Sequence, residues 1–325
     1  MQMKKIGTSS VETSEIVLGT WAMGGTYWGP ADDEESIKAI HRALDCGIVT
    51  LDTAEAYNNG YSEKIIGKAI EDRKDKVVIS TKVANYNSSY EAVKASCHRS
   101  LNNLKRDYID VYYLHWPSYE FGHPYVPFEE TLRAVAELKE EGKIRAVGLS
   151  NFSLKDFEQA KKIITVDAYQ PPFNILWRSV DDMFPYCMEN NISVFPYASV
   201  AQGLLTGTIS PGYVCGEGDK RSTTPLFQPE NMEKAWGIIR ELKQMAEKYN
   251  KSLVQFVLRW TMQFPGVTAP LVGGRTDKEI EDGIGAVGWE IKEEDFNEVN
   301  KLSLTFFNSI PKYKNYFNTE IVEGS

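Results

Sequence analysis

Four polar side chains in the first 115 residues have the types needed to move a proton. Asp52, Lys82 and His115 stand at the ends of apolar segments, and Tyr57 follows Asp52 closely. A free phenol has a pKa near ~10, and a nearby ammonium such as that of Lys82 favours the phenolate and lowers this value. Asp52 could pair with Lys82 and hold it, while His115 could hydrogen-bond a substrate oxygen. The set predicts a site that gives a proton to an oxygen, as reduction of a carbonyl by hydride requires.

Eight short β-branched or aromatic segments carry polar residues of this kind at their ends. Each segment is continuously apolar rather than alternating, which is typical of strands buried on both faces. The segments are SEIVLGT (14–20), GIVTLDT (47–53), KVVISTK (76–82), YIDVYYLH (108–115), IRAVGLS (144–150), VDAYQ (166–170), ISVFPYAS (192–199) and TAPLVGG (268–274).

Amphipathic stretches separate these segments. Residues 33–47 have apolar positions at helical spacing and stop at Gly47, residues 62–73 open with Ser62 as a candidate N-cap, and Ser153 suits the N-cap of a later helix. Strands that alternate with helices predict an α/β fold with a parallel sheet. Eight such units in 325 residues match a (β/α)8 TIM barrel, with its active site at the C-terminal ends of the strands. Because no linker divides the chain, we expect residues 1–325 to form one domain.

Two stretches interrupt the alternation. Residues 208–230 are rich in Gly, Pro and Ser. They predict a long loop on the seventh unit, of the kind that serves as a lid or binding loop. The tail 312–325 is polar with scattered aromatic residues, and it is expected either to be mobile or to pack over a face of the fold.

Bulk properties argue against several functional classes. The formal net charge of −9 disfavours binding of nucleic acid through overall electrostatics. No apolar stretch reaches the length of a membrane span, and the N-terminal residues lack the apolar core of a signal peptide. The four cysteines lack zinc-site spacing, so we expect free thiols, a cytoplasmic protein and no metal. Nothing in the sequence specifies an oligomeric state.

Taken with their order, the motifs carry a resemblance to a known family. They are LGTW (18–21), DTAEAY (52–57), GYSEKIIGKAI (60–70), STK (80–82), LHWP (114–117), GLSNFS (148–153), QPPFN (170–174), YASVAQGLLTG (197–207) and LVGGRTDKEIEDGIGAVGW (271–289). The sequence resembles the aldo-keto reductase superfamily over nearly its whole length. It looks closest to the bacterial branch that reduces small aldehydes, sugars and polyol-type ketones.

The resemblance implies a nicotinamide-dependent carbonyl reductase or alcohol dehydrogenase with a small-molecule carbonyl or alcohol substrate. Its catalytic tetrad would be Asp52, Tyr57, Lys82 and His115, and its substrate pocket would include Trp21, Trp28, Tyr57, His115 and Trp116. The cofactor would be held by three groups of residues. Ser150, Asn151 and Gln170 would hold the nicotinamide carboxamide, and Tyr197 would stack on the nicotinamide ring. Gly19, Thr20, Trp21 and Asp52 would also contact the cofactor. Those near the pyrophosphate would be Gln202, Gly203, Leu204 and Gly207, and those near the adenosine would be Gly273, Arg275, Glu279 and Asp282.

Two departures from the family pattern concern the cofactor. Gln202 stands where the family commonly has an arginine. Glu279 stands at a position that resembles the family's Gln or Arg facing the adenosine ribose, where a carboxylate would repel a 2′-phosphate and could accept a bond from a free 2′-hydroxyl. Arg275 and Lys278 act in the opposite sense. The balance favours NADP(H) slightly over NAD(H).

The same residues allow other interpretations. Asp52 and Lys82 could form a merely structural ion pair, and Arg275 could be an ordinary solvated charge. A barrel that binds its cofactor without catalysis is one alternative function, which an intact tetrad opposes. A metal-dependent lyase or isomerase barrel is another, which the scarcity of histidines at the other strand ends opposes.

Overall fold

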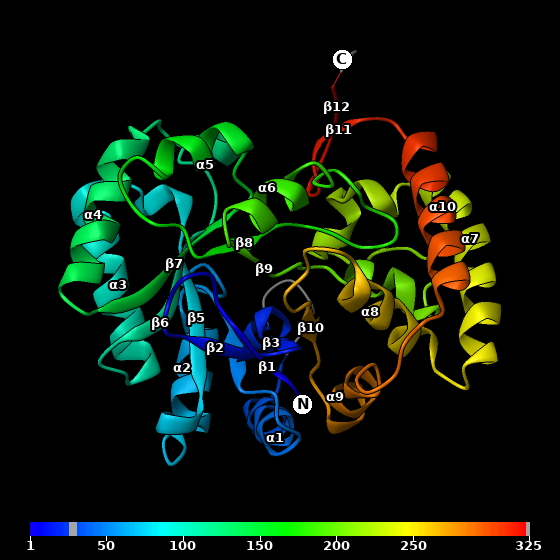
Figure 1. Ribbon diagram of the computed structural model, residues 1–325, viewed down its shortest axis with the longest axis horizontal. Helices are drawn as coiled ribbons and strands as arrows, with labels where there is room; N and C mark the ends of the chain where they lie inside the picture. Colours follow the sequence, from blue (N-terminus) through cyan, green and yellow to red (C-terminus); the bar gives the residue numbers. More distant parts are fainter. Residues whose placement is uncertain (26–30, 323–325) are drawn as a thin grey trace.

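Eight parallel strands form the centre of the computed structural model, which describes residues 1–25 and 31–322. In sheet order they are β10 (Leu271–Gly273), β3 (Val17–Gly19), β4 (Thr50–Asp52), β5 (Val78–Val83), β6 (Ile109–Leu114), β7 (Ile144–Ser150), β8 (Ala168–Gln170) and β9 (Ser193–Val194). Each coincides with one of the eight apolar segments, with β5 reaching one residue beyond its segment, so the prediction of a parallel (β/α)8 barrel is confirmed (Figure 1).

The two outer strands of this order also meet, which closes the barrel. The backbone N–H groups of Thr268 and Ala269 donate to the Val194 carbonyl, and that of Leu271 donates to the Pro196 carbonyl. The C-terminal ends of neighbouring strands lie at nearly the same level, since Gly19 pairs with Asp52 and Asp52 pairs with Ser80 in the register of the sheet. The C-terminal ends of the strands therefore form one rim, and the side chains that follow them converge there.

The opposite end of the barrel is closed by a hairpin of β1 (Met3–Lys5) and β2 (Glu12–Ser14). Ile6 and Val11 from this hairpin are buried in one cluster with residues of the strands, among them Val17 and Tyr113. The interior is thus filled by side chains at this end, which leaves the C-terminal rim as the place for a site.

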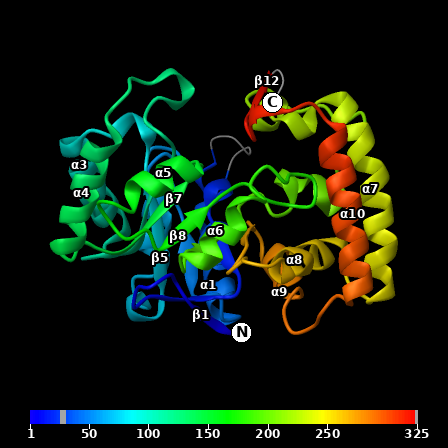
Figure 2. The ribbon, with the colours of Figure 1, turned by 45° about the horizontal axis from the view of Figure 1, so that its top comes forward.

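Helices surround the barrel, as Figure 2 shows. They are α1 (Asp33–Asp45), α2 (Tyr61–Ala69), α3 (Tyr90–Leu104), α4 (Phe128–Glu140), α5 (Leu154–Ala160), α6 (Met183–Glu189), α7 (Pro229–Lys248), α8 (Leu253–Gln263), α9 (Asp277–Ile284) and α10 (Glu293–Ser309). Among the described residues, no helix combines the length and apolarity that crossing a membrane would require.

One of the expected helix starts is wrong and another is confirmed. Ser153 caps α5 in a capping box with Asp156. Ser62 does not cap α2, because that helix begins at Tyr61 after a left-handed Gly60 with φ 78°. The Ser62 hydroxyl instead lies inside the protein against other hydroxyls, since Ser62 belongs to the first turn and faces the barrel.

The two irregular stretches both have definite structure. Residues 208–230 include two short 3-10 segments, η6 (Lys220–Thr223) and η7 (Pro225–Phe227), before α7 begins. The tail forms a hairpin of β11 (Tyr313–Asn315) and β12 (Asn318–Ile321). Its two turn residues, Tyr316 and Phe317, pack against the mouth of the barrel, so of the two outcomes expected for the tail it is packing that residues 312–322 show.

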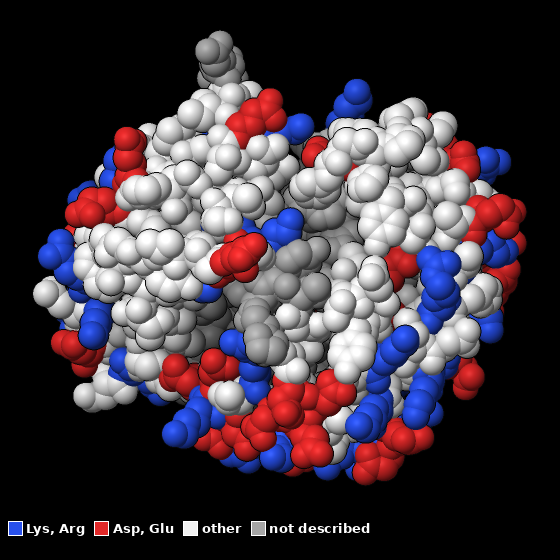
Figure 3. Space-filling view, turned by 180° about the vertical axis from the view of Figure 1, so that it is seen from behind, with Lys and Arg blue, Asp and Glu red and all other residues white. Residues whose placement is uncertain are grey.

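Seen from behind in Figure 3, lysine and arginine are interspersed with aspartate and glutamate around the edge of the molecule. No continuous positive area covers this face in the described part of the surface.

Candidate active site

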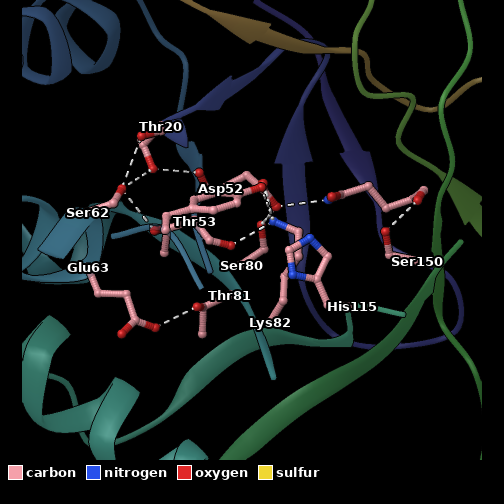
Figure 4. Close-up of polar contacts among 12 residues, drawn as sticks. Thr20, Asp52, Thr53, Ser62, Glu63, Ser80, Thr81, Lys82, His115 and Ser150 are labelled. Carbon is pink, nitrogen blue, oxygen red and sulfur yellow. Dashed lines mark hydrogen bonds and ion pairs between the residues drawn. The ribbon is translucent and has the colours of Figure 1, made fainter. Parts of the chain in front are cut away.

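The centre of the site is the ammonium of Lys82, a fully buried side chain near the end of β5 (Figure 4). Lys82 Nζ donates to Asp52 Oδ1 at 2.6 Å, to the Thr53 carbonyl at 2.7 Å and to Tyr57 Oη at 3.4 Å. An ammonium has three hydrogens to donate, so each has an acceptor. Burial alone would lower the pKa of Lys82, but Asp52 and Tyr57 outweigh it, so the pKa lies above its usual value and the side chain is charged.

The carboxylate of Asp52 is held on both of its oxygens. While Oδ1 accepts from Lys82, Oδ2 accepts from Ser80 Oγ at 2.7 Å and from Gln170 Nε2 at 2.8 Å. Asp52 is 1% exposed. All of its partners are donors, which is the arrangement that a charged carboxylate needs when it is removed from water.

Tyr57 is the part of this group closest to the open mouth of the barrel. Its ring is half-buried, stacks on Trp21 at a centroid distance of 5.9 Å and meets the His115 ring at the same distance, nearly edge-on. Burial raises the pKa of Tyr57 above its usual value, Lys82 lowers it and Asp52 raises it again, so the net direction is upward. Lys82 thus acts in the expected direction, but the expected net lowering is wrong because burial outweighs it.

His115 follows β6 and provides the second polar group beside the Tyr57 oxygen. Burial, and then the charge of Lys82, hold the pKa of His115 well below its usual value. The imidazole is therefore neutral at physiological pH, with one ring nitrogen protonated. A neutral ring can donate a hydrogen bond to an oxygen without adding a charge to the site.

Ser150, Asn151 and Gln170, expected at the nicotinamide carboxamide, form one network with Tyr197, expected on the nicotinamide ring. Tyr197 Oη donates to Asn151 Oδ1 at 2.7 Å, Asn151 Nδ2 donates to Ser150 Oγ at 3.0 Å, and Ser150 Oγ donates to the Gln170 carbonyl at 2.8 Å. Asn151 has a left-handed backbone with φ 65°. The Gln170 amide nitrogen points to Asp52, so this network and the tetrad are directly joined.

A second group fits the phosphate part of a dinucleotide. The 3-10 segment η5 (Ala201–Thr206) has left-handed backbone at Ala201, Gln202 and Gly203, and Gly207 follows with φ 73°. The Gln202 amide is buried, and neither its nitrogen nor its oxygen has a partner among the described residues. Buried polar atoms of this kind are costly unless a partner is supplied, so the segment fits a polar group of a bound cofactor.

The third group, after β10, is arranged around the start of α9. Thr276 caps this helix, and Glu279 Oε2 accepts from the backbone N–H of Arg275 at 2.7 Å. Asp282 Oδ1 instead accepts from Ser252 Oγ at 2.7 Å and Gln255 Nε2 at 2.9 Å. Asp282 therefore links α9 to the start of α8, and its carboxylate is already engaged within the protein.

Aromatic rings surround the approach to Tyr57. Trp21 and Trp116 both contact Phe317 edge-on, at 6.0 and 6.1 Å between ring centroids, and Phe317 lies parallel to Tyr197 at 6.1 Å. Trp28, also expected here, lies outside the described residues. Phe317 was missed from the sequence, where the aromatic residues of the tail were the only signal. Ser80, which supports Asp52, was missed because a serine inside an apolar strand has no distinguishing pattern.

Comparisons with known proteins agree with this geometry. The parallel barrel carries a buried Asp–Lys pair, a tyrosine and a histidine at its C-terminal rim. The model of the Aldo/keto reductase family matches residues 15–304. The chain belongs to this family, and the predictions of a nicotinamide-dependent oxidoreductase and of carbonyl reduction are confirmed at the level of the reaction class.

Bacterial relatives cover almost the whole chain. Aldo-keto reductase YhdN of Bacillus subtilis is 36% identical, over 93% of each chain. The NADH-specific methylglyoxal reductase of Escherichia coli is 32% identical, over 90% of this chain and 96% of its own. The glycerol dehydrogenase AKR11B4 from Gluconobacter oxydans has a TM-score of 0.85 and 30% identity, over 95% of this chain and 97% of its own. The predicted bacterial branch is confirmed by these relatives.

Proposed function

We propose that Tyr57 is the general acid and base of a hydride transfer between a nicotinamide cofactor and a small aldehyde, ketone or sugar-type substrate. The observation that carries the proposal is the contact between Tyr57 Oη and the charged Lys82 ammonium. A phenol with a raised pKa holds its proton at neutral pH, and an adjacent ammonium stabilises the phenolate once that proton has left.

Each member of the tetrad has a defined part in this step. When bound, the nicotinamide supplies the hydride to the carbonyl carbon and takes it back in the reverse direction. Tyr57 gives its hydroxyl proton to the carbonyl oxygen, the resulting phenolate is stabilised by Lys82, and a proton from solvent restores the phenol. The neutral imidazole of His115 donates a hydrogen bond to the same oxygen. Asp52 keeps Lys82 charged and fixed in place.

The aromatic rings at the mouth suggest a compact substrate. Trp21 and Trp116 both contact Phe317 near Tyr57, and the faces of these rings suit the carbon skeleton of a small carbonyl compound. The names of the relatives, a methylglyoxal reductase and a glycerol dehydrogenase, support small oxygen-rich substrates.

For the cofactor we propose that both forms bind, with NADP(H) preferred by less than about tenfold, or 1.4 kcal/mol. Arg275 and Lys278 attract a 2′-phosphate, whereas Glu279 repels it. The Glu279 carboxylate also accepts the hydrogen bond of the Arg275 backbone N–H just before α9, which a phosphate could otherwise accept. One relative has been solved with NADP, and another is named as NADH-specific. Ser150, Asn151, Gln170, Tyr197 and the 201–207 segment would hold the rest of the molecule.

The proposed setting follows from the same chain. We propose that residues 1–325 act as one domain and that the protein works in the cytoplasm. All four cysteines are free thiols, which suits a reducing compartment.

The test compares Tyr57→Phe with Tyr61→Phe in the same loop and helix start. Tyr61 is exposed, and its hydroxyl donates to the carboxylate of Asp33 at 2.9 Å. Tyr57→Phe should lower kcat by at least about 100-fold while the dissociation constant of NADPH stays within a few-fold. Tyr61→Phe should keep both values near those of the wild type. Retention of more than about a tenth of the activity by Tyr57→Phe would show that Tyr57 is not the general acid.

A further inference from the structure

The loop that carries Tyr57 is joined at its two ends by buried hydroxyls. Thr20, Thr53 and Ser62 are each fully buried. Figure 4 shows Ser62 Oγ between the other two, 2.8 Å from Thr20 Oγ1 and 3.1 Å from Thr53 Oγ1. Thr53 directly follows β4 and Ser62 lies in the first turn of α2. Their contact therefore connects the beginning of the Tyr57 loop to its end.

Two of these hydroxyls also bond to backbone carbonyls. Thr20 Oγ1 donates to the Asp52 carbonyl at 2.8 Å, and Ser62 Oγ lies within bonding distance of Thr20 Oγ1 and donates to the Thr20 carbonyl at 3.1 Å. Thr53 donates in turn to Ser62. Each hydroxyl has a single hydrogen, and all three are used. Removal of the central oxygen would leave two buried hydroxyls with incomplete bonding, which the protein interior penalises.

The residues that carry these three hydroxyls are bonded to both sides of the contact between Tyr57 and Lys82. On one side, Asp52 and Thr53 supply two of the three acceptors of the Lys82 ammonium. On the other side, the backbone N–H of Ser62 donates to the Tyr57 carbonyl at 3.4 Å. Ser62 is thus connected to the groups that place the ammonium and to the backbone that places the phenol.

The loop needs such a restraint because its backbone is strained. The residues between Tyr57 and α2 are Asn58, Asn59 and Gly60, with φ of 49°, 51° and 78°. Two consecutive residues other than glycine in the left-handed region are uncommon. Strained backbone persists only where the surrounding structure fixes it. Without the bond across its ends, the loop could relax and move the Tyr57 oxygen.

We infer that Ser62 is a positioning residue for proton transfer, which fixes the Tyr57 oxygen against the Lys82 ammonium through its bonds to Thr20 and Thr53. Ser62 itself touches neither the substrate nor the reacting atoms. The inference rests on the proposed role of Tyr57 as the general acid.

The experiment compares Ser62→Ala and Thr53→Val with a control of the same chemistry. Thr13→Val deletes one hydroxyl of another fully buried pair, Thr13 and Thr50, whose oxygens are 2.8 Å apart at the opposite end of β4. The two loop variants should lower kcat by about 10- to 100-fold, because a displacement of about 1 Å at a reacting group has effects of this order. The dissociation constants of NADPH and NADH should change by less than about twofold, since Thr53 and Ser62 are fully buried and neither is among the residues expected to hold the nucleotide.

The pH profile of kcat for reduction separates positioning from a general loss of stability. Moving Tyr57 away from Lys82 removes a charge that lowers its pKa, so the alkaline limb should shift to higher pH in Ser62→Ala and Thr53→Val. Thr13→Val should keep the kcat and the pH profile of the wild type at a comparable loss of unfolding free energy. If Ser62→Ala does not fold, Thr53→Val provides the same test, because valine has nearly the shape of threonine and lacks only its hydroxyl.

Two results have distinct meanings. Loop variants with the kcat and pH profile of Thr13→Val, measured beside an inactive Tyr57→Phe, would overturn the inference about Ser62 alone. An active Tyr57→Phe would instead overturn the proposed function on which the inference rests.

Discussion

Replacement of Asp52 by asparagine should expose how much the site depends on a buried charge pair. All three partners of the Asp52 carboxylate are donors: Lys82 on Oδ1, and Ser80 and Gln170 on Oδ2. An asparagine keeps one acceptor but turns an NH₂ group toward at least one of these donors. It also leaves the Lys82 ammonium buried without its counter-charge. Breaking such a pair by removal of one partner costs about 3–5 kcal/mol of unfolding free energy.

The pH dependence of this loss gives a sharper test than its size. In the wild type the pKa of Lys82 is raised above 10.5, so the stability that it contributes is fully present below that pH and is lost only as the pH rises through the folded-state pKa. In Asp52→Asn, burial should dominate and place the pKa of Lys82 below 10.5. Between that lower pKa and 10.5 the unfolded chain then binds one more proton than the folded protein. The unfolding free energy of the variant therefore rises by about 1.4 kcal/mol per pH unit.

Urea unfolding of both proteins at pH 7 and pH 9 measures this directly. The difference in unfolding free energy between the wild type and Asp52→Asn should be smaller at pH 9 than at pH 7, by as much as about 2.7 kcal/mol. Asp45→Asn is the matched control, because Asp45 pairs with Arg73 at 2.7 Å with a side chain that is 56% exposed, and it should cost less than about 1 kcal/mol with little change in pH dependence. A deficit of Asp52→Asn that is the same at both pH values would show that Lys82 stays charged without Asp52 and would refute the reasoning.

Four further outcomes are expected. In fluorescence titrations, Arg275→Ala should weaken NADPH binding by about 1.5–3 kcal/mol and barely alter NADH binding. Glu279→Gln should raise the ratio of NADPH to NADH affinity. An unchanged ratio in both variants would contradict the proposed nucleotide contacts. Phe317→Ala removes a ring that contacts Trp21 and Trp116, so KM for small carbonyl substrates should rise more than kcat falls in steady-state assays. Because the pKa of His115 is far below 6.5, kcat for reduction should show no histidine titration between pH 5.5 and 7.5 in buffers of constant ionic strength. Incubation with a chelator should leave activity unchanged, and a loss that a divalent ion restores would favour a metal-dependent reaction instead.

The sequence by itself determined the barrel and indicated the four polar residues that come together at its rim. Buried parallel strands are apolar on both faces, so their positions can be read locally from continuous runs, and the polar residue after each run is then the residue at the rim. Asp52, Lys82 and His115 could be placed in this way. Their identities also determine the chemistry available, since a carboxylate, an ammonium and an imidazole have ordinary pKa values that bracket neutrality.

Only the tertiary structure decided how these groups affect one another. The pKa of Tyr57 is raised because burial outweighs the charge of Lys82, and burial depends on elements from the whole chain. Gln170 bonds Asp52 across 118 positions of sequence, and Phe317 reaches Trp21 from the other end of the chain. Ser62 carries the N-cap signature of a helix start, yet its hydroxyl faces Thr20 and Thr53, because the neighbouring strand ends come together in register only once the barrel has closed. Contacts of this kind have no local sequence pattern, since they depend on the packing of distant elements and not on the spacing of residues along one of them.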